Sequence, residues 1–329
     1  MISLKISKKE EISQYLHSKN WLNCQDQKLV ITKPGEGNMN YVIRVQCLGN
    51  SIILKQSSSC VEKYPQIPAP AHRVLVEGAF YELVKNKVDI NIYMPQMVGL
   101  DQEHYIMAIE DLGETMDYSS LYSEKSLLKE GTLTLLVSYL SNLHHGFMSS
   151  KPDPIFENLE MRSLNHQHIF RYPFMIDNGF DLNSVTPGLQ QVALQYKNNE
   201  TLKSKIDVLG KHYLENGKYL LHGDYYPGSW VKSKKGLKII DPEFCFYGSR
   251  EFDLGVLQAH LIITGNEGKF KSIVGRTYQH FAQLDKSLIE AYAGIEIMRR
   301  LIGLAQLPLN RSLENKVSLL SQAYHLIQP

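Results

Sequence analysis

The chain has 329 residues, which is more than one hydrophobic core usually organises, so we expect two packed lobes. Its residues are 43% hydrophobic and 21% charged with a formal net charge of +1, which excludes a general electrostatic attraction to nucleic acid or to an anionic membrane. No stretch approaches the ~20 apolar residues of a membrane span, and the four cysteines lack C-x-x-C spacing. We therefore expect a cytoplasmic protein with neither nucleic acid nor membrane as partner.

The first third of the chain predicts an antiparallel sheet with one inserted helix. Gly49-Asn50 is expected to join the first two strands as a tight hairpin, and residues 99–102 to join the last two. Between the two pairs, residues 72–86 have apolar side chains at helical spacing. The strands are expected in four short runs of branched and aromatic residues, at 41–48, 51–56, 92–98 and 104–112.

Helical patterns dominate after residue 112. One apolar stripe begins at Leu133, and residues 288–305 form a second long amphipathic pattern. A short hairpin is expected around residues 229–241, where two β-like runs flank a Lys-Gly turn. The fold class is therefore predicted to be α+β, with an N-terminal lobe over 1–112, a helical C-terminal lobe over 113–329, and a hinge near 110–114.

The segment LHGDYYPGSW, residues 221–230, places Asp224 just before the expected hairpin. Asp241 and Glu243 follow the hairpin in IDPEF. An acid that aligns a hydroxyl nucleophile and an acid that holds a metal on phosphate oxygens can both be carried at the ends of one hairpin. Ser229 lies five residues after Asp224, where the catalytic loop of protein kinases has its metal-binding Asn, and a hydroxyl also binds Mg²⁺. The pattern predicts Asp224 as catalytic base and Ser229, Asp241 and Glu243 as Mg²⁺ ligands.

Phosphoryl transfer from ATP also requires a Gly-containing loop, a strand Lys and a helical Glu, and the first lobe offers all three in this order. Gly35 and Gly37 precede the first strand, Lys55 lies in the second, and Glu77 lies in the inserted helix. Taken singly, Lys55 and Glu77 have the simpler explanation of solvated surface charges. The last strand ends in a segment whose backbone is expected to meet adenine, namely Glu110, Asp111 and Leu112.

Several motifs together resemble methylthioribose kinases, a branch of the aminoglycoside phosphotransferase and choline kinase group with a protein-kinase-like fold. They are GEGNMNYV, ILKQ, AIEDL, HGDYYPGS, IDPEFCFYG, FDLG and MRRLIGLA, and they extend from about residue 30 to 306. The resemblance implies that Asn38 and Lys55 bind ATP, that Asp224 contacts the sugar hydroxyl, and that Arg299 or Arg300 meets the substrate. It also implies a homodimer.

Some residues depart from the pattern of this family. Tyr225-Tyr226 follow HGD where Leu-His is usual, and Gln306 replaces a His. These departures concern the acceptor, and we expect Tyr225 to contact it. Because neighbouring helical residues point about 100° apart, only one of Arg299 and Arg300 is expected to face the acceptor. An arginine favours a sugar over a cation, so 5-methylthioribose or a related pentose is the expected acceptor.

Three alternatives remain open at this point. The acceptor can be an aminoglycoside, choline or another amino alcohol, handled by the same fold. The chain can also be a catalytically inactive nucleotide-binding relative, although retention of Asp224 argues against that. A protein kinase proper is the weakest alternative, because IDPEF replaces D-F-G and A-P-E is missing.

Overall fold

The computed structural model describes residues 2–22, 28–35, 39–123 and 127–328. The chain divides into two compact units. The first comprises Met1–Thr115 and Lys232–Cys245, and the second comprises Met116–Val231 and Phe246–Pro329. The predicted boundary between the lobes at residues 112 and 113 stays a prediction. The segment 232–245 falls within the predicted C-terminal lobe, but its contacts group it with the first unit.

The first unit is built on a sheet of five described strands in the order β1-β2-β3-β5-β4, in which all neighbours are antiparallel. Alternate residues of β2 point into the core, because successive side chains of a strand face opposite sides of the sheet. The strands are β1 (Val30–Thr32), β2 (Tyr41–Cys47), β3 (Asn50–Gln56), β4 (Met97–Asp101) and β5 (Ile106–Glu110).

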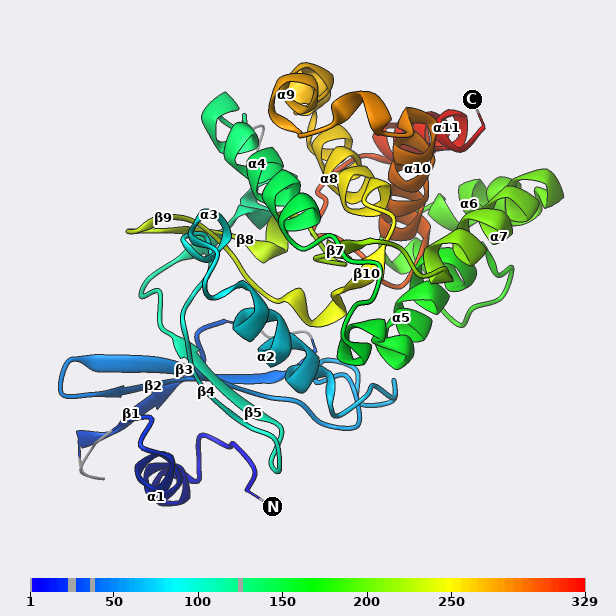
Figure 1. Ribbon diagram of the computed structural model, residues 1–329. Coiled ribbons are helices and arrows are strands. Elements are labelled where there is room, and N and C mark those ends of the chain that lie inside the picture. Colours follow the sequence, from blue (N-terminus) through cyan, green and yellow to red (C-terminus); the bar gives the residue numbers. More distant parts are fainter. Residues whose placement is uncertain (1, 23–27, 36–38, 124–126, 329) are drawn as a thin grey trace. The chain divides into compact units, whose positions relative to one another are not determined.

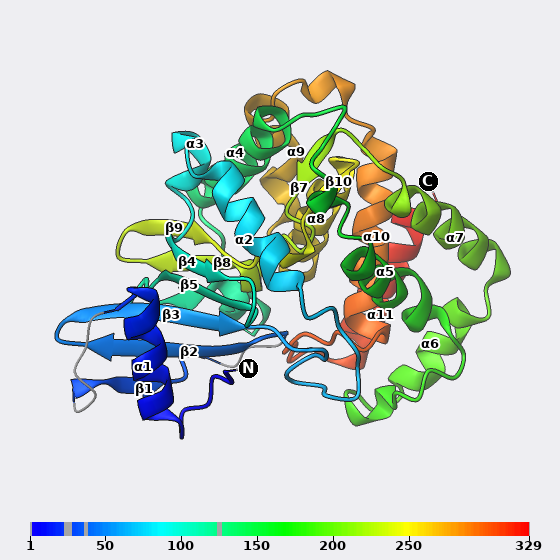
Figure 2. The same ribbon diagram turned by 60° about the horizontal axis from the view of Figure 1, so that its bottom comes forward.

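Helices cover both faces of this sheet. α1 (Lys9–Lys19) runs across the strands (Figure 2). Its Ile12 and Leu16 belong to the same buried cluster as Ile43 and Val45 of β2. α2 (Arg73–Val84) lies on the opposite face, and α3 (Val88–Asn91) follows it (Figure 1). The inserted helix predicted from the sequence is therefore confirmed as α2.

Both predicted hairpins exist, but their turns differ from the prediction. Asn50 pairs with Cys47, so the first turn consists of Leu48 and Gly49, which both have positive φ. This is the backbone geometry of a tight two-residue turn. In the second hairpin β4 continues to Asp101, and the turn spans residues 102–105. Cys47, the last residue of β2, is disulfide-bonded.

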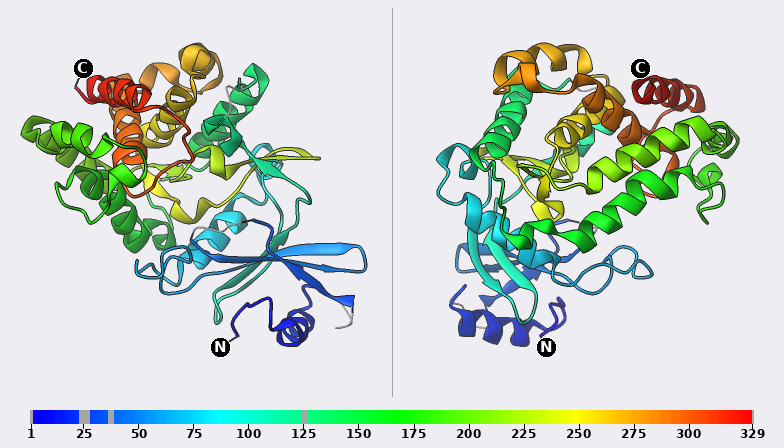
Figure 3. Two further views of the ribbon diagram at one scale, coloured as in Figure 1. Left: turned by 180° about the vertical axis from the view of Figure 1, so that it is seen from behind. Right: turned by 45° about the vertical axis from the view of Figure 1, so that its right-hand side comes forward.

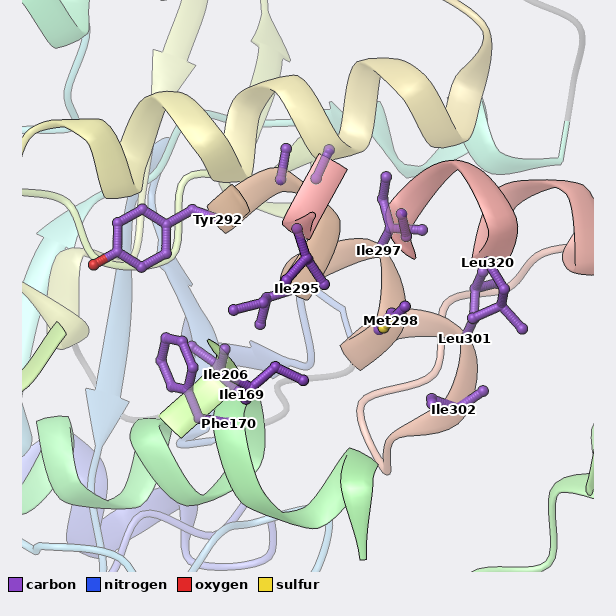
Figure 4. Close-up of a cluster of buried hydrophobic side chains, with 14 of the residues drawn as sticks. Ile169, Phe170, Ile206, Tyr292, Ile295, Ile297, Met298, Leu301, Ile302 and Leu320 are labelled. Atoms are coloured by element: carbon purple, nitrogen blue, oxygen red, sulfur yellow. The ribbon is translucent and has the colours of Figure 1, made fainter. Parts of the chain in front are cut away.

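The second unit consists mainly of helices around one large core (Figure 4). α10 (Lys286–Ile302) packs against α8 (Glu251–Thr264) and α11 (Leu313–Ile327), and two glycines allow the close approach. A Cβ at Gly255 would lie 2.6 Å from the Tyr292 Cβ, and a Cβ at Gly294 would lie 2.5 Å from the Ala323 carbonyl oxygen. The helices are α4 (Glu130–Gly146), α5 (Leu159–His166), α6 (Leu189–Lys197), α7 (Glu200–Leu214), α8 (Glu251–Thr264), α9 (Phe270–Thr277), α10 (Lys286–Ile302) and α11 (Leu313–Ile327), with α6, α7 and α11 seen best in Figure 3.

Short strands frame the loops of this unit. β7 (Tyr219–Leu221) pairs with β10 (Phe246–Gly248). A third sheet has the order β6-β8-β9, with β6 at Met116–Asp117, β8 at Trp230–Ser233 and β9 at Gly236–Ile239, and β9 belongs to the segment 232–245 of the first unit. The predicted stripe of α4, which begins at Leu133, is buried as expected. Among the described residues, no helix combines the length and the apolar character needed to cross a membrane.

Candidate active site

In the first unit, β3 and α2 bring a lysine and a glutamate together. The Lys55 Nζ lies 2.6 Å from the Glu77 Oε2. Both side chains are buried, so neither is the solvated surface charge that its residue type would suggest in isolation. Val42 pairs with Lys55 in the strand register, which fixes the position of the lysine beside β2. The structure therefore brings two of the predicted ATP-binding residues into direct contact.

The segment after β9 brings Asp241 to the same lysine. The Asp241 Oδ1 accepts a hydrogen bond of 2.8 Å from the Lys55 Nζ, while half of the aspartate side chain stays exposed. Asp241 has φ 61° and ψ 51°, the left-handed region that non-glycine residues rarely occupy. Such conformations cost free energy and gather at functional sites. Asp241 thus has both an accessible carboxylate and a fixed, unusual backbone.

A buried arginine, which the sequence did not single out, connects the neighbouring Glu243 to the rest of this unit. The Arg73 Nε donates to the Asn40 Oδ1 at 2.8 Å, and the Asn40 Nδ2 donates to the Glu243 Oε2 at 2.8 Å. Arg73 also lies 3.5 Å from that same Glu243 oxygen. Its remaining N–H groups donate to the backbone carbonyls of Met39, Ser58, Cys60 and Pro70.

The carboxyl groups of this cluster outnumber its cationic side chains. Lys55 and Arg73 face the carboxylates of Glu77, Asp241 and Glu243. Burial alone would lower the pKa of the Lys55 ammonium, but the carboxylates, Asp241 foremost, outweigh burial and raise it. Burial raises the pKa of the Glu77 carboxyl and that of Glu243, and the other carboxylates add to this shift. A cation beside Asp241 would relieve the excess negative charge.

The donor set agrees with magnesium better than with a transition metal. Within the ranges that the structure describes, no group of three or more His, Cys, Asp or Glu residues is arranged to hold a metal ion by itself. Magnesium is usually held by one or two carboxylates and completes its coordination with water and substrate phosphates. The half-exposed Asp241 fits that role, whereas Glu243 is buried and already accepts from Asn40.

The other residues predicted to bind the nucleotide lie in the glycine loop and at the end of β5. Gly37 and Asn38 lie outside the described residues. Gly35 is exposed, and a Cβ built on it would have no neighbouring atom within 4 Å. The side chains of Glu110 and Asp111 take part in contacts within the unit, with Lys235 and with Arg44. Leu112 follows β5 and is half-buried. The Glu110 N–H donates to the Gln96 carbonyl, and the adenine contact of residues 110–112 stays a prediction.

In the second unit, an aspartate at the start of α8 accepts hydrogen bonds from the backbone of the HGD loop. The Asp253 Oδ2 accepts from the His222 backbone N–H at 2.8 Å, and its Oδ1 accepts from the Gly223 N–H at 3.0 Å. The same carboxylate lies 3.1 Å from the His144 Nε2, and all of these groups are buried. Because two successive backbone amides are fixed by one carboxylate, the side chain of the next residue, Asp224, has a defined direction. Asp253 is a further residue that we did not predict, although it lies in the FDLG motif.

Asp224 faces two guanidinium groups. Its Oδ1 lies 3.4 Å from the Arg300 Nη2 and 3.9 Å from the Arg299 Nη1. Both side chains are long enough to converge on Asp224 from adjacent positions of α10. The expectation that only one of the two arginines faces the acceptor stays a prediction. The cluster combines a partly exposed carboxylate with preorganised N–H donors, which suits recognition of a hydroxyl group.

Two other predicted residues of this loop face the protein interior. Tyr225 is fully buried, stacks on Tyr139 and donates its hydroxyl to the Leu136 carbonyl at 3.0 Å. The predicted substrate contact of Tyr225 is therefore wrong, because its ring is used to pack the loop on α4. Ser229 is buried, and its hydroxyl donates to the Asp224 carbonyl at 2.9 Å. The role of Ser229 as a metal ligand stays a prediction.

Comparison with known proteins gives relatives along most of the chain. No family model matches it. Methylthioribose kinases from two strains of Bacillus cereus are 27% and 28% identical to it, cover 93% and 86% of it, and are themselves covered to 87% and 81%.

Solved structures share its fold. A choline kinase from Streptococcus pneumoniae has a TM-score of 0.53 at 12% identity and covers 97% of this chain and 98% of its own. A spectinomycin phosphotransferase in complex with ADP and spectinomycin has a TM-score of 0.54 at 13% identity, with 97% of both chains covered. The predicted resemblance to methylthioribose kinases and the predicted protein-kinase-like fold class are confirmed.

Proposed function

We propose that this chain transfers the γ-phosphoryl group of ATP to the anomeric hydroxyl of 5-methylthioribose or a closely related pentose. The chain is an ATP-dependent phosphotransferase with an alcohol group as acceptor, as its curated relatives and its fold together indicate. The choice of a sugar is the finer part of the proposal. The observation that carries it is the convergence of Arg299 and Arg300 on Asp224.

On the nucleotide side, the proposal gives each member of the first-unit cluster a role. Lys55, held by Glu77, pairs with the α- and β-phosphates of ATP. Asp241 is the principal ligand of Mg²⁺, and Glu243 is its neighbour that also fixes Asn40. These two carboxylates would hold Mg²⁺, which would supply positive charge against the phosphate oxygens of ATP. The excess negative charge of the cluster supports this assignment.

On the acceptor side, Asp224 accepts the proton of the attacking hydroxyl. As the oxygen–phosphorus bond forms, the bond between the γ-phosphorus and the β,γ-bridging oxygen breaks, and ADP leaves with that electron pair. The guanidiniums of Arg299 and Arg300 donate to sugar hydroxyls and favour the charge that develops on the nucleophilic oxygen. Tyr225 has no part in this assignment.

Charge favours a neutral acceptor over a cation. The two arginines meet two carboxylates, Asp224 and the buried Glu296, so the acceptor residues sum to no net charge. Choline or an aminoglycoside would bring positive charge against two guanidiniums with no carboxylate left to balance it. A sugar offers hydroxyls that both accept from arginine and donate to Asp224.

A panel of acceptors tests the proposal. Purified protein with ATP and Mg²⁺ is assayed for ADP release with 5-methylthioribose, ribose, choline and kanamycin at equal concentrations. We expect the highest kcat/KM with methylthioribose. Faster turnover of choline or kanamycin than of both sugars would overturn the substrate while leaving the phosphotransferase class intact.

A further inference from the structure

A buried glutamate lies one helical turn before the two arginines of α10. The Glu296 Oε2 lies 3.1 Å from the Arg299 Nη1, and its Oε1 accepts from the Arg300 Nε at 2.6 Å. Positions three and four residues apart lie on one side of a helix, so Glu296 reaches both arginines although these point in different directions. This explains how adjacent residues converge on Asp224.

His260 contacts Glu296 as well, and Tyr122 in turn contacts His260. The His260 Nε2 lies 3.2 Å from the Glu296 Oε1, and the His260 Nδ1 lies 2.7 Å from the Tyr122 hydroxyl. Burial lowers the pKa of His260, which favours the neutral ring. A neutral imidazole has one donor and one acceptor nitrogen. Since the carboxylate can only accept, Nε2–H donates to Glu296 and Nδ1 accepts from the tyrosine.

Glu296 itself remains ionised. Burial alone would raise the pKa of its carboxyl, but Arg299, Arg300 and His260 hold it well below the ordinary value. The donors and acceptors are therefore assigned throughout. Tyr122 donates to His260, His260 donates to Glu296, and Arg300 donates to both Glu296 and Asp224. The Arg300 guanidinium also lies over the Tyr226 ring, 4.7 Å from its centroid, which limits its rotation.

We propose that Glu296, held by His260 and Tyr122, is a positioning residue that keeps Arg299 and Arg300 oriented toward the acceptor and off a full salt bridge with Asp224. The inference rests on the proposed function of Asp224 as base. Arginine binds carboxylates readily through two parallel N–H bonds. With Glu296 present, Arg300 gives its Nε to Glu296 and reaches Asp224 only through Nη2, at 3.4 Å. Without Glu296, Arg300 loses the partner of its Nε and Arg299 retains its bond to Asn165. The guanidiniums can then close on Asp224 and occupy the oxygens that the acceptor hydroxyl needs.

The test compares Glu296→Gln with wild type in three measurements: kcat/KM for 5-methylthioribose, KM for ATP, and slow ATP hydrolysis without acceptor. We expect kcat/KM for the acceptor to fall roughly 10- to 100-fold, as for lost hydrogen bonds to a charged group. KM for ATP and acceptor-free hydrolysis should stay within about 2-fold, because the proposed ATP-binding residues lie in the other unit. Glu251→Gln is the matched control, since Glu251 is also a buried carboxylate beside an arginine in the second unit.

A second variant keeps the inference testable if Glu296→Gln does not fold. Tyr122→Phe removes only the hydroxyl that fixes His260, and we expect a 2- to 10-fold loss in kcat/KM for the acceptor, the equivalent of about one neutral hydrogen bond. Equal losses in all three measurements, or wild-type acceptor kinetics in both variants, would overturn the positioning role. If wild type prefers another acceptor of the panel, the same comparison is made with that acceptor, so the substrate proposal can fail separately.

Discussion

Arg73 makes more polar contacts than a surface arginine would, and replacing it with lysine tests how much of the first unit depends on them. The substitution keeps the positive charge beside Glu243 but exchanges a planar fork of five N–H groups for one ammonium with three. In the structure, the guanidinium donates to Asn40 and to four backbone carbonyls from Met39, Ser58, Cys60 and Pro70.

The magnitude follows from counting acceptors. An ammonium can satisfy at most three of these five acceptors, so at least two lose their hydrogen bond from the side chain of residue 73. The carbonyls of Met39, Cys60 and Pro70 keep a second donor, namely the Glu62 N–H, the Ser58 hydroxyl and the backbone N–H of residue 73 itself, so each loss costs about 0.5–1.5 kcal/mol, the net contribution of one hydrogen bond. We therefore expect Arg73→Lys to lower the free energy of unfolding of the first unit by roughly 1–3 kcal/mol, which for a domain of this size corresponds to a decrease in Tm of about 3–10 °C.

The assay is thermal unfolding followed by calorimetry, with and without Mg²⁺-ATP. Arg44→Lys is the control, because Arg44 also pairs with a carboxylate of the first unit but is only part-buried and makes fewer hydrogen bonds. Since Arg73 also fixes Asn40 and, through it, Glu243, the KM for ATP should rise in the same variant. A Tm within 2 °C of wild type at unchanged KM would refute the reasoning, because it would mean that the hydrogen bonds lost with the guanidinium are replaced at little cost.

Three other outcomes are expected. Asp224→Asn should reduce kcat by roughly 10²- to 10⁴-fold, the usual contribution of a general base, with KM for ATP almost unchanged in steady-state kinetics; wild-type turnover would remove Asp224 from the mechanism. Asp241→Ala should abolish turnover, whereas Glu243→Ala should mainly raise the Mg²⁺ concentration needed for half-maximal rate; normal Mg²⁺ dependence in both would assign the ion to another pair. Burial lowers the pKa of His145 to about 4. Between pH 6.5 and 4 the imidazole is therefore protonated in the unfolded chain but neutral in the folded chain. The free energy of unfolding should fall as the pH decreases through this range. In denaturant titrations at pH 7.5 and 5.5, His145→Gln should lose less stability than wild type, whereas the exposed His17→Gln should behave as wild type does.

The elements that the sequence predicted well are those with a strong local pattern. Strand alternation identified β2 and β3, and apolar spacing identified α2 and α4. The turn of the first hairpin was assigned one residue too late, because Gly49-Asn50 is a good turn pair by composition. Pairing of Cys47 with Asn50 instead places Leu48 in the turn, at a positive φ that its residue type does not favour.

The site residues that belong to a sequence motif could be predicted. Those whose role arises from contacts with other parts of the chain could not. Lys55, Glu77 and Asp241 have motif positions, and the structure brings them together. Arg73 and Glu296 lie in ordinary helical patterns. The role of Arg73 depends on Asn40 and Glu243, which are distant in the chain, and Glu296 is held by the distant His260 as well as by Arg299 and Arg300 of its own helix. Tyr225 shows the reverse error, because proximity to Asp224 in sequence says nothing about which side of the loop a side chain occupies.

The division of the chain has a consequence for how such proteins diversify. The polypeptide passes between the two units three times, near residues 115, 231 and 245, and the segment with Asp241 and Glu243 returns to the unit of Lys55. A fragment ending at 115 would lack both carboxylates, so recombination at that single junction cannot exchange the phosphate-handling residues as a set. Asp224, Arg299 and Arg300, in contrast, all belong to one unit. Mutations that retune the acceptor can accumulate there without altering the residues that hold the donor.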